Sequence, residues 1–207
     1  MSKFFTFFFL LFITWIRVAA LIEESFQKYK IVPGVIPKGP KEDLEVLYGD
    51  DEVNFGNFLR PSQTRDKPEL YWRADANSLY MLVMIDLDAP SRKDPERKEN
   101  LHWLVVNIPG SASYNGETII DYIGARPSAG TGPHRYLFLV YEQSNHLNNI
   151  KNELKSKRNF KVKTFADKHK LGIPIAGNFF RSRRLCPLRR QCFETQYVNP
   201  KNEFDYL

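Results

Sequence analysis

The most informative segment of the sequence is Leu79-Tyr-Met-Leu-Val-Met-Ile-Asp86-Leu-Asp-Ala-Pro90-Ser-Arg92. It opens with an unbroken apolar run, Leu79–Ile85, and then changes to carboxylates and proline. A short apolar run with β-branched and aromatic residues, bounded by turn residues, predicts a β-strand covered on both faces. The polar residues at its end indicate the mouth of a pocket rather than more core.

Two further apolar runs, Leu101–Ile108 and Tyr136–Tyr141, predict the other core strands. A histidine stands at the start of each, His102 in the second strand and His134 at the opening of the third. Because side chains alternate along a strand, Tyr136 shares the face of His134 and the intervening arginine points to the other face.

These polar residues can meet under one strand order. The end of the first strand, at Asp86, meets the start of the second, at His102, in an antiparallel pair joined by the 89–100 loop. His134 joins them only if the third strand runs antiparallel to the first and lies on its other side. The sequence permits this order without proving it.

The rest of the chain predicts short strands and a few helices. Strands are expected at Leu44–Tyr48, Val53–Phe55, Leu70–Trp72 and Ile173–Phe180, and helices at Glu23–Lys30, Ser144–Arg158 and Thr164–Leu171. Thr164 is the expected N-cap of the last helix, which Gly172 ends. The pattern predicts a mainly β protein with α additions, a two-sheet β-sandwich with peripheral helices.

The residues at the strand ends favour binding over catalysis. Two imidazoles, a carboxylate and a tyrosine hydroxyl near the Gly130-Thr131-Gly132 loop supply several hydrogen-bond donors. The carboxylate, Asp86, would fix the tautomers of both histidines. Each residue taken singly has an ordinary structural interpretation, as a buried histidine or a turn, so the hypothesis rests on the combination.

Other chemistries fit less well. No serine stands in a strand–turn–helix elbow, which disfavours a hydrolase. A metal site from Asp86, Asp88, His102 and His134 is chemically possible, but no closely spaced ligand pair supports it. We therefore expect an anion-binding pocket, with no catalysis, no metal and no cofactor.

The N-terminus has the order of a secretory signal peptide. Lys3 supplies a positive charge, Phe4–Ile16 is apolar, and Val18-Ala-Ala20 offers small residues for cleavage after Ala20. The apolar run is shorter than the roughly 20 residues that a spanning helix needs. We expect a signal peptide at 1–20, one domain at 21–185, a tail at 186–207, and secretion to the extracellular space.

Charge and cysteine content agree with this interpretation. The formal net charge of the chain is +6. Its lysines and arginines are scattered among acidic residues, which disfavours a nucleic-acid partner. The exception is Arg181–Arg190, where five arginines fall in ten residues; a solvated face explains this run best. In an oxidising compartment the only two cysteines, Cys186 and Cys192, are read as a disulfide.

Three blocks resemble the signatures of the phosphatidylethanolamine-binding protein family. They are Asp86–Pro95, His102-Trp-Leu-Val-Val-Asn107, and Gly132-Pro-His-Arg-Tyr136 with Leu139-Val-Tyr-Glu-Gln143 behind it. The signal peptide and the cysteine-containing C-terminus look like those of secreted invertebrate members. The resemblance implies two antiparallel sheets, peripheral helices and a pocket at one end that takes phosphate-like anions, including phospholipid headgroups.

The resemblance also implies which residues form the pocket. The positions carried over are Asp86, Ala89, Pro90, His102, Gly124, Pro127, His134 and Tyr136. The Ala89–Pro90 bond is expected to be cis. This chain departs from the family pattern at Leu87, where the family usually has proline, at Asn100, where a pocket tryptophan is common, and at Arg97, where a tyrosine often stands. These departures predict a more open and more polar pocket.

The sequence is consistent with three functions. The first is a monomeric binding protein for a phospholipid headgroup or another phosphorylated small molecule, with peripheral membrane contact. The second is a regulator that binds a protein partner, such as a protease or kinase inhibitor, with the arginine-rich segment as its surface. The third is a carrier of small hydrophobic or odorant molecules.

Overall fold

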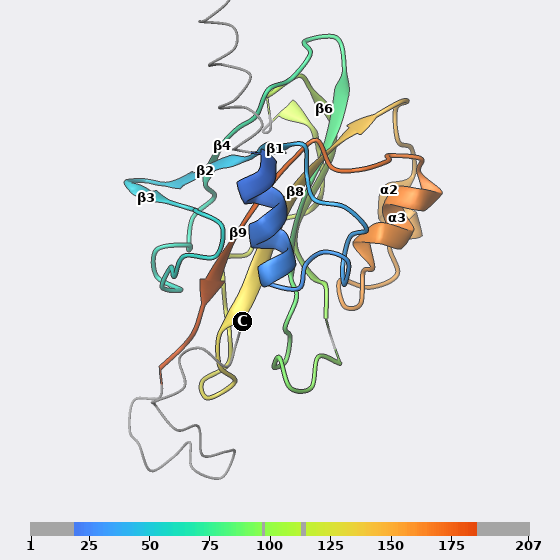
Figure 1. Ribbon diagram of the computed structural model, residues 1–207. Coiled ribbons are helices and arrows are strands. Elements are labelled where there is room, and N and C mark those ends of the chain that lie inside the picture. Colours follow the sequence, from blue (N-terminus) through green and yellow to red (C-terminus); the bar gives the residue numbers. More distant parts are fainter. Residues whose placement is uncertain (1–18, 97, 113–114, 186–207) are drawn as a thin grey trace, which may run out of the picture.

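Two β-sheets form the frame of the protein in the computed structural model, which describes residues 19–96, 98–112 and 115–185 (Figure 1). The larger sheet has six strands in the order β1-β9-β8-β5-β6-β7, and the smaller has three in the order β3-β2-β4. The two-sheet, mainly β architecture with few helices confirms the predicted fold class.

The strand bounds follow the chain from the N-terminal side. The strands are β1 (Glu42–Asp43), β2 (Glu45–Tyr48), β3 (Asp51–Glu52), β4 (Glu69–Tyr71), β5 (Leu79–Asp86), β6 (Asn100–Pro109), β7 (Glu117–Ile120), β8 (His134–Gln143) and β9 (Ala176–Ser182). The helices with defined bounds are α2 (Ile150–Glu153) and α3 (Val162–Lys168), and residues 19–28 are also helical.

The centre of the larger sheet has the order that convergence of the polar residues requires. β5 pairs antiparallel with β6 on one side and with β8 on the other. All three strands are buried along nearly their whole length, as continuous apolar runs predict. The sheet departs from the fully antiparallel expectation at its edge, where β1 pairs parallel with β9.

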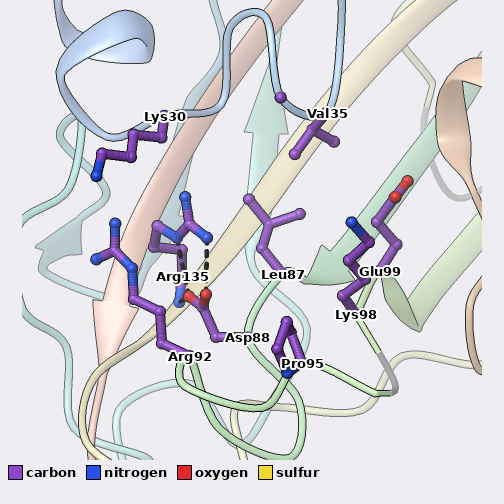
Figure 2. Close-up of a pocket in the computed structure, with 10 residues that line it drawn as sticks. Lys30, Val35, Leu87, Asp88, Arg92, Pro95, Lys98, Glu99 and Arg135 are labelled. Carbon is purple, nitrogen blue, oxygen red and sulfur yellow. Dashed lines mark hydrogen bonds and ion pairs between the residues drawn. The ribbon is translucent and has the colours of Figure 1, made fainter.

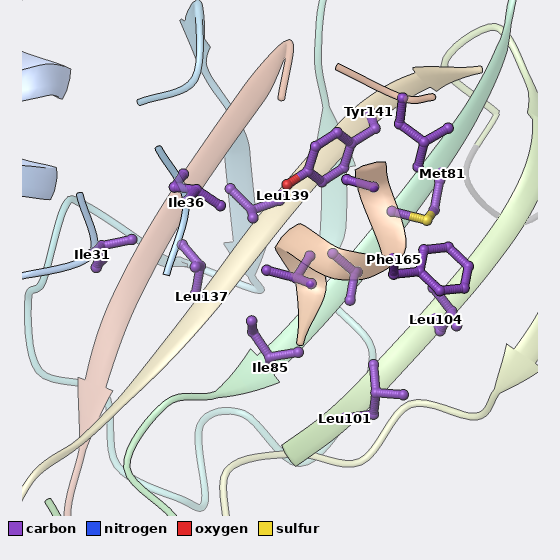
Figure 3. Packing of buried hydrophobic residues seen from close by; sticks show 14 of the residues in the cluster. Ile31, Ile36, Met81, Ile85, Leu101, Leu104, Leu137, Leu139, Tyr141 and Phe165 are labelled. Atoms are coloured by element: carbon purple, nitrogen blue, oxygen red, sulfur yellow. The ribbon is translucent and has the colours of Figure 1, made fainter. Parts of the chain in front are cut away.

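The larger sheet separates two hydrophobic cores. On one face, side chains such as Leu82, Trp103 and Phe180 pack beneath the smaller sheet. On the other face, alternate residues of the same strands pack against α3 and the N-terminal segment; Figure 3 shows Met81 and Leu104 near Phe165 of α3. This division determines the side of the sheet on which each strand-end residue lies.

The N-terminal helical segment lies across the larger sheet (Figure 1). Its Phe26 is fully buried and meets Phe179 of β9 edge to face, with the ring centroids 5.4 Å apart. Residues 1–18 of the predicted signal peptide and both cysteines of the predicted disulfide lie outside the described residues. No helix within 19–96, 98–112 and 115–185 is long and apolar enough to cross a membrane.

Several predicted elements differ from the structure. Val53–Phe55 is not a strand, because the hairpin closes earlier, at β3. The helix expected at Ser144–Arg158 is reduced to α2, in which only Ile150 is buried, so little apolar surface supports a longer helix. The short edge strands β1 and β7 were not predicted.

The cap of α3 also differs from the prediction. The helix begins at Val162, so Thr164 lies inside its first turn and is exposed. Lys161 occupies the N-cap position without a side-chain cap hydrogen bond. Instead the carboxylate of Glu99, 63 residues away in the chain, accepts the Val162 N–H at 2.7 Å. A long-range contact therefore satisfies the helix end.

Candidate functional site

Asp86 and His134 form the centre of the candidate site. In the β5–β8 pairing Asp86 lies opposite Tyr136, which brings the end of β5 to the start of β8. Asp86 Oδ2 accepts a hydrogen bond from His134 Nδ1 at 2.8 Å, and both side chains are buried. Asp86 Oδ1 accepts the backbone N–H of Asp88 at 2.8 Å. The carboxylate is thus held on both oxygens, and it fixes the His134 ring.

The second ring nitrogen of His134 has a hydroxyl partner. Thr131 Oγ1 lies 2.9 Å from His134 Nε2 and 2.8 Å from the Ser128 carbonyl oxygen, to which it donates. While the Thr131 hydroxyl donates to Ser128, its oxygen can accept a hydrogen bond from a protonated Nε2. If the hydroxyl rotates, it can instead donate to an unprotonated Nε2. The ring therefore has a partner in both protonation states.

Tyr136 joins the two histidines. Its ring lies edge to face with His102, at a centroid distance of 5.2 Å, and stacks with His134 at 6.4 Å. Its hydroxyl accepts the Arg126 backbone N–H at 3.3 Å and is hydrogen-bonded to Asp86. Burial, and after it the Asp86 charge, raise the pKa of Tyr136 far above its ordinary value. The phenol thus remains a neutral donor.

His102 is held differently from His134. Its Nδ1 donates to the Ile123 carbonyl oxygen at 2.7 Å, since a carbonyl can only accept. Burial lowers the pKa of His102 below its ordinary value, although the hydrogen bond to Ile123 and the Asp86 charge act in the opposite direction. The prediction that Asp86 fixes both tautomers is therefore wrong for His102, whose orientation a backbone carbonyl determines.

Gly124 occupies a position where the chain approaches closely. A Cβ at this glycine would lie 2.0 Å from the Thr64 carbonyl oxygen, so no side chain fits. The next residue, Ala125, donates its N–H to Thr64 Oγ1 at 3.1 Å. These contacts hold the segment that carries Ile123 to His102 and Arg126 to Tyr136, with Pro127 buried beside them. The close approach thus serves the site indirectly.

The loop that leaves β5 carries the remaining predicted residues. The Ala89–Pro90 peptide is cis, as expected, and both residues are half-buried. Leu87, where the family usually has proline, donates its N–H to the Arg135 carbonyl oxygen at 2.9 Å, a bond that proline cannot make. Asn100 begins β6 and is half-buried, and Arg97 lies outside the described residues.

Two residues at the site were missed by sequence reasoning. Arg126 stands between Gly124 and Pro127, and its charge acts on His102. A cation between two expected pocket residues was a signal that could have identified it. Thr131 was seen only as part of a glycine-rich loop, and its contact with His134 depends on the loop conformation.

The site as a whole presents imidazole, phenol and backbone donors around one engaged carboxylate. Such a set can bind a small anion through hydrogen bonds and charge. Over the ranges that the structure describes, no group of three or more His, Cys, Asp and Glu side chains is placed to hold a metal ion.

This fold and site define a class of β-rich binding proteins, and the comparison with protein families specifies it. Residues 49–180 match the family model described as phosphatidylethanolamine-binding protein. The chain belongs to the phosphatidylethanolamine-binding protein family.

Two curated relatives have names that point to the extracellular space. A candidate odorant-binding protein, A5, of Drosophila melanogaster is 34% identical over 168 residues, which cover 78% of this chain and 80% of the relative. A 26 kDa secreted antigen of Toxocara canis is 39% identical over 158 residues, which cover 73% of this chain and 60% of the antigen. The match thus spans less than two thirds of the antigen's length.

Among solved structures, the chain resembles a carboxypeptidase Y inhibitor crystallised in complex with its cognate proteinase. The TM-score is 0.71 at 27% sequence identity, and the match covers 80% of this chain and 96% of the inhibitor. The relatives and the structural neighbour named here are thus described as binding, antigenic or inhibitory proteins.

Proposed function

We propose that this protein is a secreted, non-enzymatic binding protein whose site takes a phosphate-like anion, either free or as a phospholipid headgroup. The observation that carries the proposal is the buried His134 ring, held by Asp86 at one nitrogen and by Thr131 at the other. The remaining predicted residues complete the site: Ala89, Pro90, His102, Gly124, Pro127 and Tyr136.

The contacts suggest how an anion would bind. The Thr131 hydroxyl is the present hydrogen-bond partner of His134 Nε2. An incoming phosphate oxygen would displace this hydroxyl and accept the hydrogen bond from Nε2. Arg126, exposed at the rim, adds a cation. The neutral Tyr136 phenol is not an activated nucleophile, which supports binding without catalysis. The polar character of these groups favours an anion over an apolar odorant.

Export and chain organisation belong to the same proposal. The signal-peptide pattern at 1–20 and the secreted antigen among the relatives support an extracellular location. We place the binding domain at 21–185 and a tail with a Cys186–Cys192 disulfide at 186–207. A monomer that binds its ligand alone, with transient contact to a membrane surface, is consistent with this organisation.

Calorimetric titration of the secreted protein with phosphorylethanolamine tests the site. His134→Ala should weaken binding by about tenfold or more, because a charge-assisted hydrogen bond to the phosphate is lost. His146→Ala is the matched control, since His146 is exposed and, within the described part of the chain, hydrogen-bonds only to Asn148. Equal affinity of the His134 variant and the wild type would refute the site assignment.

A protein-binding regulator is the second candidate, and the likeness to the carboxypeptidase Y inhibitor favours it. Its surface would be the start of the arginine-rich segment, where Arg183 and Arg184 are exposed. Steady-state assays of carboxypeptidase Y with the purified protein test this candidate. Inhibition that survives His134→Ala but is lost on substitution of both arginines by alanine would establish it, and no inhibition at all would reject it for this protease.

A further inference from the structure

A cavity lies on the face of the strand ends opposite to Asp86 and His134. It measures about 240 Å³. Figure 2 shows its lining, which consists of Lys30, Gly34, Val35, Leu87, Asp88, Arg92, Pro95, Lys98, Glu99 and Arg135. Among these described lining residues, none is one of the eight expected at the first site. Strand alternation explains the separation, because Leu87 and Arg135 point away from Asp86 and His134.

The carboxylates of this cavity are already engaged by the protein. The Asp88 carboxylate accepts two hydrogen bonds from the Arg135 guanidinium, from Nη2 to Oδ1 at 2.7 Å and from Nε to Oδ2 at 2.8 Å. Glu99 accepts the Val162 N–H and lies 3.8 Å from Lys161 Nζ. Each carboxylate therefore already has partners within the protein, and the two carboxylates face four cationic side chains in the lining, those of Lys30, Arg92, Lys98 and Arg135.

Positive charge exceeds negative charge in the lining. Lys30 and Arg92 extend toward the Arg135 side of the cavity, and Lys98 lies across from them beside Glu99 (Figure 2). Burial, and after it the charge of Arg135, lower the pKa of Arg92, and the charge of Arg181 adds to this effect, whereas the charge of Asp88 acts in the opposite direction. Several guanidinium groups thus lie close enough to repel one another, and a bound anion would relieve that repulsion.

We propose that this cavity is a second anion site that binds a phosphate group, independent of the site at His134. Arg92 and Lys30 would contact the phosphate oxygens, while the Asp88–Arg135 pair forms the rigid floor. A guanidinium group binds phosphate through two parallel, bidentate hydrogen bonds, and a lysine ammonium adds a point charge on a flexible side chain. The phosphate can come from a soluble phosphorylated compound or from a lipid headgroup.

NMR titration of the secreted protein with inorganic phosphate tests the proposal. Two groups of backbone amides report on the two sites: Gly34 and Val35 on the cavity, and Thr131 and His134 on the first site. We expect the cavity amides to shift in the wild type and in His134→Ala. In the double variant Lys30→Gln/Arg92→Gln their apparent affinity should fall by about tenfold or more, while Thr131 responds as before.

Lys93→Gln is the matched control, because Lys93 is exposed in the same loop and does not line the cavity. Unmoved cavity amides in the wild type would overturn the proposal. So would unchanged titrations of the double variant, or an equal loss of affinity in Lys93→Gln, which would indicate a general charge effect. A failure confined to Thr131 and His134 would count against the first site alone.

Vesicles distinguish the two sources of phosphate. Because the first site is also proposed to take a headgroup, these variants are compared in the His134→Ala background. Co-sedimentation with vesicles of phosphatidic acid and phosphatidylcholine should there be retained by Lys93→Gln and lost by Lys30→Gln/Arg92→Gln if a lipid headgroup enters the cavity. Cavity shifts with inorganic phosphate but no co-sedimentation would identify a soluble phosphorylated compound. Each of these results requires phosphate in the cavity and therefore supports the proposal.

Discussion

The two histidines of the first site differ in what holds each ring. His134 lies between a carboxylate at Nδ1 and a hydroxyl at Nε2. His102 is bound by the Ile123 carbonyl in a buried setting that disfavours the charged form. The two rings thus have different partners: two side chains hold His134, and a backbone carbonyl orients His102.

The lowered pKa of His102 predicts a pH effect on stability. The unfolded chain takes up a proton near the ordinary histidine pKa of about 6.5, whereas the folded chain takes it up only at lower pH. Below about pH 6.5 the unfolded state therefore binds more protons, and stability falls as pH falls. The loss from this one group is at most about 1.4 kcal/mol per pH unit.

Urea unfolding at about pH 7 and pH 5 measures this effect. His102→Gln, which cannot titrate, should lose less stability over this range than the wild type. An identical loss in the two proteins would show that the burial of His102 has no such consequence.

At the residue scale, part of the site was predictable and part was not. Strand alternation and one antiparallel order were enough to bring Asp86, His134 and Tyr136 together. His102 joins them through a feature that alternation does not predict: the β5–β6 register shifts between Met84 and Ile85, which leaves His102 unpaired in the ladder and on the face of Tyr136 rather than that of Leu104. The partners of the two rings could not be foreseen, because Ile123 and Thr131 lie in loops whose conformation depends on contacts remote in sequence. One such contact is the approach of Gly124 to Thr64.

At the scale of elements, α3 shows how a distant residue can replace a local cap. Glu99→Ala should destabilise the protein by about 1–2 kcal/mol, since it leaves the Val162 N–H without its acceptor. Thr164→Ala should be nearly neutral, because Thr164 is exposed within the helix. Chemical denaturation measures the free energy of unfolding of both variants. A larger loss of stability in Thr164→Ala than in Glu99→Ala would contradict the role of Glu99 and support Thr164 as the cap.

The elements that sequence reasoning placed well are those with strong apolar patterns. β5, β6 and β8 are long and buried, so their composition alone indicated them. The short edge strands β1, β3 and β7 carry few apolar residues, and their pairing partners determine where they form. The helix start predicted at Thr164 was wrong because a tertiary contact, from Glu99 to the Val162 N–H, determines where α3 begins.

At the scale of the whole molecule, the Asp88–Arg135 pair joins the N-terminal segment to the sheet. Arg135 also donates to the Tyr29 carbonyl oxygen, so one guanidinium connects the strand ends to the residue after the first helix. Asp88 further donates its N–H to Asp86. The pair thus supports both sites, which lie on opposite faces of one sheet.

Removal of one partner from this pair should be costly. Asp88→Ala leaves the guanidinium of Arg135 buried without its counter-charge, and we expect a loss of about 3–5 kcal/mol. Asp94→Ala, an exposed change in the same loop, should cost little. Thermal or urea unfolding of both variants measures the difference, and equal stabilities would contradict this role of the pair.

A crystal structure of the secreted protein grown with phosphorylethanolamine would show whether an anion binds at His134. We expect a phosphate oxygen within hydrogen-bond distance of His134 Nε2, with the Thr131 hydroxyl displaced and the Asp86 contact intact. Thr131 still bonded to Nε2, in crystals whose ligand binds elsewhere at saturating concentration, would contradict an anion site at His134.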